Sequence, residues 1–134
     1  MSAFALDSDI VSYLLKKDKA VLSRLKEEMD RGREFILPPV VYYEVKRGLL
    51  SANATERLRL FSELCQDLTI GVMEMAAWDE AAKLYARQRQ RGRLAGDADL
   101  LIAAFCLTGN YKLVTNNIRH FETIAGLVCV NWKN

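Results

Sequence analysis

Four apolar residues followed at once by acidic ones, Ala3-Phe4-Ala5-Leu6-Asp7-Ser8-Asp9, indicate the architecture of this protein. A run this short and this apolar is typical of a strand that is buried on both faces, as in a parallel sheet. The polar residues after it then lie at the carboxyl end of the strand. We therefore expect a buried strand over residues 3–6 that places Asp7 and Asp9 at one edge of a sheet.

Short apolar runs and helical patterns alternate along the rest of the chain, which favours a parallel sheet covered by helices. Further strands are expected at residues 35–37, 68–73, 112–115 and 127–130. Helices are expected at residues 10–15, 18–31, 38–48, 54–68, 76–91 and 97–107. The predicted fold class is α/β, a three-layer α/β/α sandwich with a short, mainly parallel central sheet.

Size and composition limit the kind of protein that this can be. The chain has 134 residues, of which 51% are hydrophobic and 27% charged, so residues 1–134 are expected to form a single folded domain. A net charge of +2 is too small to identify a polyanionic partner. Three cysteines in apolar surroundings, Cys65, Cys106 and Cys129, favour buried thiols over disulfides or a zinc site.

The sequence has no segment that we expect to enter a membrane. Its longest uncharged stretch, residues 100–111, is well short of the ~20 apolar residues that span a bilayer. Asp7 and Asp9 interrupt the position where a signal peptide would carry its apolar core. We expect a protein of the cytoplasm that has no membrane partner.

Acidic residues recur where strands end and helices begin. Asp7 follows the first strand, Glu44 interrupts an apolar helix face, and Asp97 and Asp99 begin an uncharged helix. If the sheet is parallel, these groups meet at one edge of it. Carboxylates that converge repel one another unless a hard cation neutralises them, which indicates Mg²⁺ or Mn²⁺. With His120 as the single histidine, neither a zinc site nor a Ser/His/Asp triad is expected.

Each acidic residue also has a structural explanation, and these alternatives stay open at this point. Asp7 and Asp97 are suited to cap helices, and Glu44 is placed to pair with a nearby base. Asp99 is harder to explain in this way, because it lies in the first turn of a helix that otherwise faces the core. Asp9 is expected to hold the turn after Asp7.

Basic residues lead directly into the last acidic pair. Four arginines, Arg87, Arg89, Arg91 and Arg93, precede Asp97, and Lys46 and Arg47 follow Glu44. Guanidinium groups bind phosphates in bidentate fashion, so these residues are candidates for binding the backbone of a nucleic acid. The structural alternative is a solvated helix end that the helix dipole favours.

Five motifs, in this order, together resemble the PIN-domain ribonucleases. They are residues 4–10 (FALDSDI), 43–48 (YEVKRG), 96–104 (GDADLLIAA), 113–117 (LVTNN) with Phe121, and 130–132 (VNW). They are similar to the family's LLDTNI opening, its xELxxG helix, its DxLIAA and LVTNNxxxF motifs, and a common ending. The similarity covers essentially the whole chain and is greatest to VapC-type toxins of toxin–antitoxin pairs.

The resemblance implies an endoribonuclease that depends on Mg²⁺ or Mn²⁺, forms a homodimer and is inhibited by a VapB-type antitoxin. By position, Asp7, Glu44 and Asp99 would be the catalytic and metal-binding carboxylates. Asp97 and Asn117 are further candidate ligands, because the family often has a fourth acid where this chain has Asn116, Asn117 and His120. Asp9, Thr115 and Asn116 would support the site.

Two alternatives come from other classes of protein. Asp7-Ser8-Asp9 also resembles the DxD nucleophile motif of haloacid-dehalogenase-like phosphatases. The later Ser/Thr and Lys motifs of that class are not found in this sequence. A PIN-like module that binds RNA or a protein without cutting is the other alternative, against which the retained acids argue.

Overall fold

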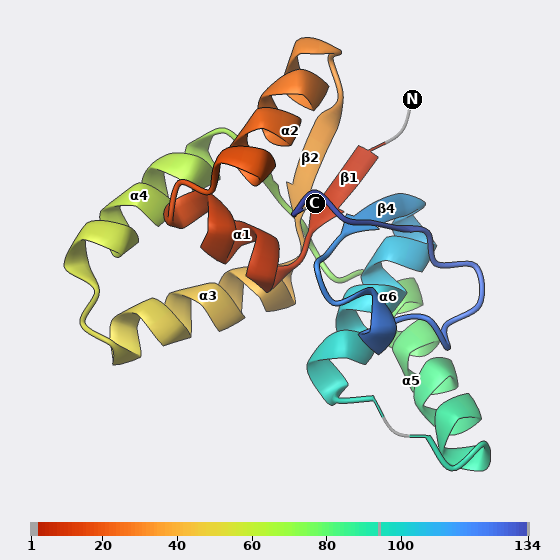
Figure 1. Ribbon diagram of the computed structural model, residues 1–134. Coiled ribbons are helices and arrows are strands. Elements are labelled where there is room, and N and C mark those ends of the chain that lie inside the picture. The colour runs from red at the N-terminus through yellow and green to blue at the C-terminus, as the bar shows by residue number, and fades with distance from the viewer. Residues whose placement is uncertain (1–2, 94, 134) are drawn as a thin grey trace.

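The computed structural model describes residues 3–93 and 95–133, and a five-stranded sheet runs through its middle (Figure 1). The strands are β1 (Ala3–Leu6), β2 (Glu34–Leu37), β3 (Thr69–Ile70), β4 (Tyr111–Val114) and β5 (Cys129–Val130). The helices are α1 (Ser8–Leu15), α2 (Lys19–Asp30), α3 (Pro39–Ser51), α4 (Thr55–Gln66), α5 (Met75–Gln90) and α6 (Asp97–Gly109), with a 3₁₀ turn, η1 (Ile118–His120).

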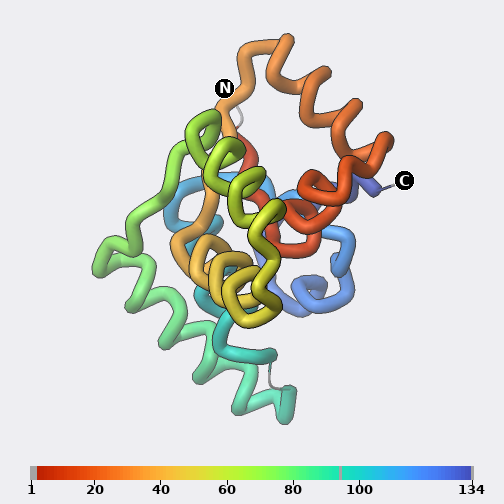
Figure 2. The backbone as a smooth tube through the Cα atoms, turned by 90° about the vertical axis from the view of Figure 1, so that its left-hand side faces the viewer, coloured from red at the N-terminus to blue at the C-terminus, as the bar shows by residue number. Residues whose placement is uncertain are grey.

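The strands lie in the order β3-β2-β1-β4-β5, and every neighbouring pair is parallel. From β1 the chain moves outward to β2 and β3, and it then returns to the other side of β1 to form β4 and β5. Helices α1 to α4 lie to one side of the sheet, and α5 and α6 lie together on the other (Figures 1 and 2). The order of the strands reverses between β1 and β4, where open α/β sheets bind their ligands.

Local residues set where several helices begin and end. The Asp18 carboxylate accepts a hydrogen bond from the Val21 amide at 3.1 Å and so caps α2. Pro39 opens α3 at a position where a missing N–H costs nothing. Asn110 ends α6 in the left-handed conformation with φ of 58°, which asparagine tolerates better than most residues.

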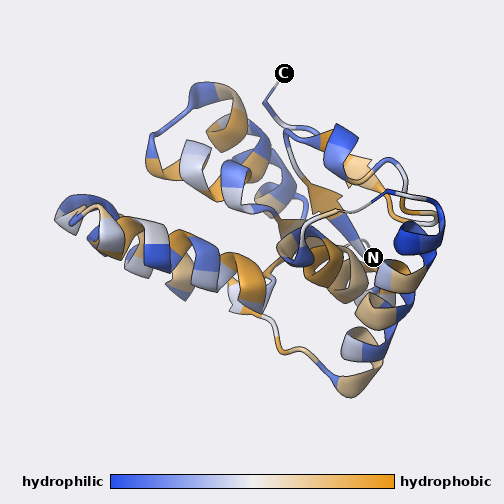
Figure 3. Ribbon diagram, turned by 90° about the horizontal axis from the view of Figure 1, so that it is seen from below, coloured by the Kyte–Doolittle hydropathy of each residue, from blue (hydrophilic) through white to orange (hydrophobic). Residues whose placement is uncertain are grey.

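The core is built on β1 and closed by a residue near the end of the chain. Phe4 stacks on Phe35 of β2, with ring centroids 5.8 Å apart, and Trp132 meets both rings edge-on. All three side chains are buried. Most helices carry both hydrophobic and hydrophilic residues (Figure 3), whereas α6 is apolar and largely buried beyond its first turn.

The α/β sandwich that the sequence predicts is confirmed, but several boundaries differ. The strand expected at residues 68–73 is paired only over Thr69–Ile70, because its neighbour β2 ends at Leu37 and offers no further partner. The last strand is also shorter, and α1 begins at Ser8 because Asp7 caps it. Among the cysteines only Cys106 is buried, and Cys65 and Cys129 are half-buried. That residues 1–134 form one domain stays a prediction.

Candidate active site

Asp7 lies buried where the order of the strands reverses, between the carboxyl ends of β1 and β4. One carboxylate oxygen accepts a hydrogen bond from the Ser8 amide at 2.8 Å, and the other accepts one from the Thr115 hydroxyl, also at 2.8 Å. The Asn117 amide donates in turn to that hydroxyl at 3.0 Å. Burial raises the pKa of Asp7, and these hydrogen bonds oppose the increase. The side chain is thus held in a fixed orientation by both neighbouring strand ends.

Asp9 is the second carboxylate at this edge, and only one of its two oxygens accepts a hydrogen bond from the part of the chain that the structure describes. Its Oδ2 accepts a hydrogen bond from the Asn116 amide at 2.9 Å, whereas its buried Oδ1 has no partner among the described residues. Burial, together with the charge of Asp7, raises the pKa of Asp9 to about 6. The Asn116 side chain is fixed by Tyr13 and Asn131. Asp9 therefore ties the start of α1 to the loop after β4, whereas Asp7, rather than Asp9, caps the helix.

Glu44 reaches the same region from α3 and is half-buried. Its pKa is raised by burial first, and the charges of Asp7 and Asp99 raise it further. Arg47, one turn along α3, opposes the increase without cancelling it. Because the charges of Asp7 and Asp99 both act on Glu44, the three carboxylates from separate elements lie within electrostatic reach of one another. The pairing of Glu44 with a nearby base therefore does not account for its position.

Asp99 enters the site from the first turn of α6 and has a partner that the sequence did not reveal. His120 of η1 places its Nδ1 3.4 Å from Asp99 Oδ2. Burial raises the pKa of Asp99, His120 opposes this increase, and Asp7 adds to it. His120 and Asp99 are far apart in the sequence, and no local pattern links them. Only the folded loop after β4 brings them together.

The remaining candidate ligands lie at the protein surface. Asp97 and Asn117 are exposed. In the ranges that the structure describes, no three His, Cys, Asp or Glu side chains gather closely enough to hold one ion. Glu44 and Asp9 line one hollow, and Asp99 and His120 line another.

The predicted basic rim is only partly assembled beside these carboxylates. Arg93 lines the hollow that contains Asp99 and His120. Of the other arginines, Arg87 lies 3.8 Å from Glu80. Arg89 contacts the Tyr85 hydroxyl at 3.5 Å, and Arg91 is exposed at the end of α5. On α3, Lys46 lies over the Tyr42 ring and Arg47 over the Tyr43 ring.

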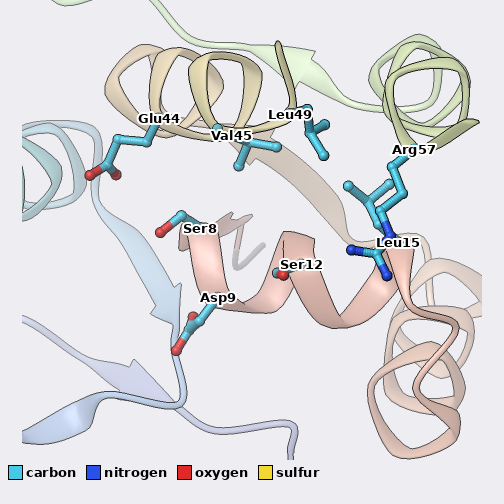
Figure 4. A pocket seen from close by; sticks show the side chains of 9 residues that line it. Ser8, Asp9, Ser12, Leu15, Glu44, Val45, Leu49 and Arg57 are labelled. Carbon is cyan, nitrogen blue, oxygen red and sulfur yellow. The ribbon is translucent and has the colours of Figure 1, made fainter. Parts of the chain in front are cut away.

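A second feature that sequence reasoning missed is Arg57. Figure 4 shows the hollow between α1, α3 and α4, with Glu44, Ser8 and Asp9 toward one end and Arg57 beside Leu15 at the other. Arg57 belongs to α4, which carries none of the acidic motifs. The amphipathic pattern marks it only as an exposed helix residue, so nothing in the sequence connects it with the site.

Acidic side chains at the strand-order reversal of a five-stranded parallel sheet place this chain among the α/β proteins with a candidate site at the carboxyl edge of the sheet. Comparison with known proteins specifies the family. The profile of the PIN domain matches residues 4–127, so the chain belongs to the PIN domain family. The resemblance found in the five motifs is confirmed. The DxD phosphatase alternative is wrong, because Asp7 to Asp9 form part of this domain.

Proteins similar to this chain carry ribonuclease names. It is 26% identical over 134 residues to "Ribonuclease VapC2" of Rickettsia felis, covering 96% of this chain and 97% of that protein. It is also 26% identical to the "tRNA(fMet)-specific endonuclease VapC" of Shigella flexneri, covering 99% and 100%.

Solved structures show the same fold. The crystal structure of VapBC2 from Rickettsia felis bound to a promoter DNA fragment matches with a TM-score of 0.85 and 25% identity, covering 97% of this chain and 98% of that one. The DNA-bound VapBC of Salmonella typhimurium matches with a TM-score of 0.87 and 22% identity, covering 98% and 99%. In the described part of the chain, each helix is too short or too polar to cross a bilayer.

Proposed function

We propose that this protein is an endoribonuclease, the toxin of a VapBC-type toxin–antitoxin pair, which cleaves RNA phosphodiester bonds with the aid of a divalent metal ion. The observation that carries the proposal is that Asp7 is buried and fixed by Thr115 at the strand-order reversal, near enough to Glu44 and Asp99, from two other elements, for its charge to raise the pKa of both. The family and the names of its similar members support RNA as the substrate.

The donor set suits Mg²⁺ or Mn²⁺. Carboxylate oxygens are the ligands that these hard cations prefer, and carboxylates with raised pKa values gain from a neighbouring positive charge. The unpartnered Oδ1 of Asp9 is a further oxygen that a cation would satisfy. Although the side chains do not surround one point in the described structure, Asp7, Glu44 and Asp99 are the residues that would hold the metal, with Asp97 and Asn117 as outer candidates. A metal bound there would lower the pKa of the attacking water and shield the leaving oxygen.

The chain's own residues prepare this chemistry. Thr115 and the Ser8 amide keep Asp7 in one orientation, and Asn116 does the same for Asp9. Arg93 lies in the hollow of Asp99, where a guanidinium can bind an RNA phosphate. Arg87, Arg89, Arg91, Lys46 and Arg47 are proposed to extend RNA binding beyond this hollow. His120 orients Asp99.

The partners follow from the same proposal. A VapB-type antitoxin would inhibit the enzyme, and two copies of the chain would form a homodimer. Since the substrate is cellular RNA, the enzyme would act in the cytoplasm. The similar structures are of VapBC from Rickettsia felis, Salmonella typhimurium and Haemophilus influenzae, which supports an antitoxin partner.

Substitution of the central carboxylates tests the enzyme assignment. Asp7→Asn and Asp99→Asn should each lower the rate of RNA cleavage by at least about 100-fold, because each removes a carboxylate that would hold the metal ion, whose positive charge would stabilise the transition state. Asp30→Asn, at the exposed end of α2, is the matched control and should cleave at the normal rate. Circular dichroism checks that all three variants fold. Undiminished cleavage by both site variants would exclude the nuclease, and RNA binding without any cleavage by the unsubstituted protein would favour the non-catalytic module.

A further inference from the structure

The hollow between α1, α3 and α4 has opposite character at its two ends (Figure 4). Asp9 and Glu44 make one end acidic, and the Arg57 guanidinium lies at the other, next to Leu15. Between them the lining is apolar, from Val45 and Leu49 of α3, with the hydroxyl-bearing Ser8 and Ser12 of α1 opposite. The hollow therefore begins at Glu44, one of the proposed catalytic carboxylates, and at Asp9, and it ends at a cation.

Arg57 differs from its near neighbour Arg59 in the groups that surround it. Arg59 is exposed on the same helix, and its guanidinium forms ion pairs with Glu56 and Glu63. Within the described ranges, none of the ion pairs includes Arg57. An arginine whose five donors face a hollow without a carboxylate partner is available to an anion from outside.

The length of the hollow fits a strand that leaves the catalytic carboxylates. Ser8 and Leu15 are the first and last residues of α1, so the axis between them is about 10 Å long at ~1.5 Å per residue. An RNA chain carries a negative charge at every nucleotide. When one phosphate lies at the carboxylates, the neighbouring phosphates of the same strand lie along the hollow and need positive charge of their own. Arg57 lies where such a flanking phosphate would pass.

We propose that Arg57 binds a backbone phosphate of the RNA substrate that flanks the scissile one, so that this hollow is a substrate-binding groove. The proposal rests on the proposed ribonuclease function and names how the strand lies relative to that site. The guanidinium pairs with the phosphate in bidentate geometry, and the Ser8 and Ser12 hydroxyls face the ribose. Val45 and Leu49 offer an apolar surface to a base.

Charge decides between RNA and an acidic peptide as the occupant. The acidic end of the groove repels an anion unless a cation neutralises it, and a divalent ion held by these carboxylates would let one RNA strand meet positive charge at both ends of the groove. An acidic peptide would satisfy only Arg57. Continuity of the groove with Glu44 and Asp9 therefore favours the RNA strand.

The test compares Arg57→Gln with Arg59→Gln, which removes the same charge from the same helix. Cleavage of a single-stranded RNA is measured in Mg²⁺ with the purified protein. Arg57→Gln should raise KM about tenfold with little change in kcat, since the contact forms equally in the ground and transition states. Arg59→Gln should leave both constants unchanged, and Arg57→Lys should recover part of the lost affinity.

Binding without cleavage gives a second readout. In the Asp7→Asn background, Arg57→Gln should also reduce the slope of log Kd against log salt by about 0.7, the value for one phosphate of a single strand. Equal KM values and equal salt slopes for the Arg57 and Arg59 variants would overturn the phosphate assignment. It would also be overturned if Arg57→Gln lost binding to an acidic peptide while its binding to RNA stayed unchanged. Absence of RNA cleavage by the unsubstituted protein would instead overturn the proposed function, so the two failures are distinguishable.

Discussion

Two acidic residues at the end of β1, Asp7 and Asp9, differ in how far their surroundings satisfy them. Both oxygens of Asp7 accept hydrogen bonds, whereas Asp9 has one oxygen that accepts a hydrogen bond and one that is buried with no partner among residues 3–93 and 95–133. A buried carboxylate that lacks partners favours its protonated form. The charge on Asp9 is therefore a source of instability in the metal-free protein.

This instability predicts a pH dependence. The pKa of Asp9 is raised from 3.8 to about 6, so its contribution to stability is fully present below 3.8 and is lost as the pH rises through about 6. In EDTA, Asp9→Asn should therefore raise Tm at pH 7.5 and change it little at pH 3.5. Thermal unfolding followed by circular dichroism measures both.

Asp18→Asn is the control of opposite sign. Its carboxylate pairs with Lys133 at 2.9 Å, and this hydrogen bond lowers the pKa of Asp18. The contribution of Asp18 to the stability of the fold is present above the ordinary pKa of this carboxyl and is lost as the pH falls. Asp18→Asn should thus lower Tm at pH 7.5. The same pH profile for Asp9→Asn and the unsubstituted protein would contradict the role of Asp9.

At the residue scale, the sequence predicts a site residue best where that residue directly follows a strand. The apolar run before Asp7 predicts its place at the sheet edge, and the motif around Asp99 predicts its helix. The contact of Asp99 with His120 and the position of Arg57 in the groove were missed. Both depend on how loops and helices pack across long distances in the chain, and no local period records such contacts.

At the scale of elements, β3 shows how a neighbour limits a strand. The apolar pattern continues to residue 73, but pairing stops at Ile70 because β2 ends opposite it. Gly71 follows at once and donates its amide to the Leu37 carbonyl at 2.8 Å. Patterns of hydrophobicity predict that a strand exists, and its length depends on a partner that the pattern does not describe.

Gly71 itself is required by close packing. A Cβ atom added there would overlap the Phe105 ring, which is stacked on Tyr111. Gly71→Ala should lower the free energy of unfolding by about 1–3 kcal/mol, the usual cost of overpacking. Gly48→Ala, in α3 with no neighbour within 4 Å of the added atom, should instead raise it by about 0.5–1 kcal/mol. Urea unfolding measures both, and equal effects of the two substitutions would contradict this account.

At the scale of the whole molecule, charge is distributed unevenly although its net value is only +2. Arg89 and Arg91 lie near the end of α5, far from α2 in Figure 1. If they bind RNA phosphates, the double substitution to Gln should weaken RNA binding and flatten its salt dependence. Replacing the exposed Lys19 and Lys26 of α2 by Gln is the control. An unchanged slope for the arginine variant would assign these side chains to the solvated surface.

The β3–α5 segment leaves an apolar surface uncovered. Val72, Met75 and Trp78 are 70%, 71% and 47% exposed, and Met75 and Trp78 lie one turn apart on α5. Exposed apolar side chains cost free energy in water, and the proposed homodimer offers a second copy to cover them. Val72, the first of these residues, lies two positions beyond the edge strand β3.

Met75→Asp should therefore shift the protein from dimer to monomer, because burying an unpaired carboxylate at an interface costs several times the free energy of one lost apolar contact. Light scattering after size-exclusion chromatography measures the mass. Leu22→Asp, which places the same charge at a partly exposed apolar position of α2, should leave the mass unchanged. A dimer that survives Met75→Asp would mean that the two copies meet through another face, and the patch would then need a different partner.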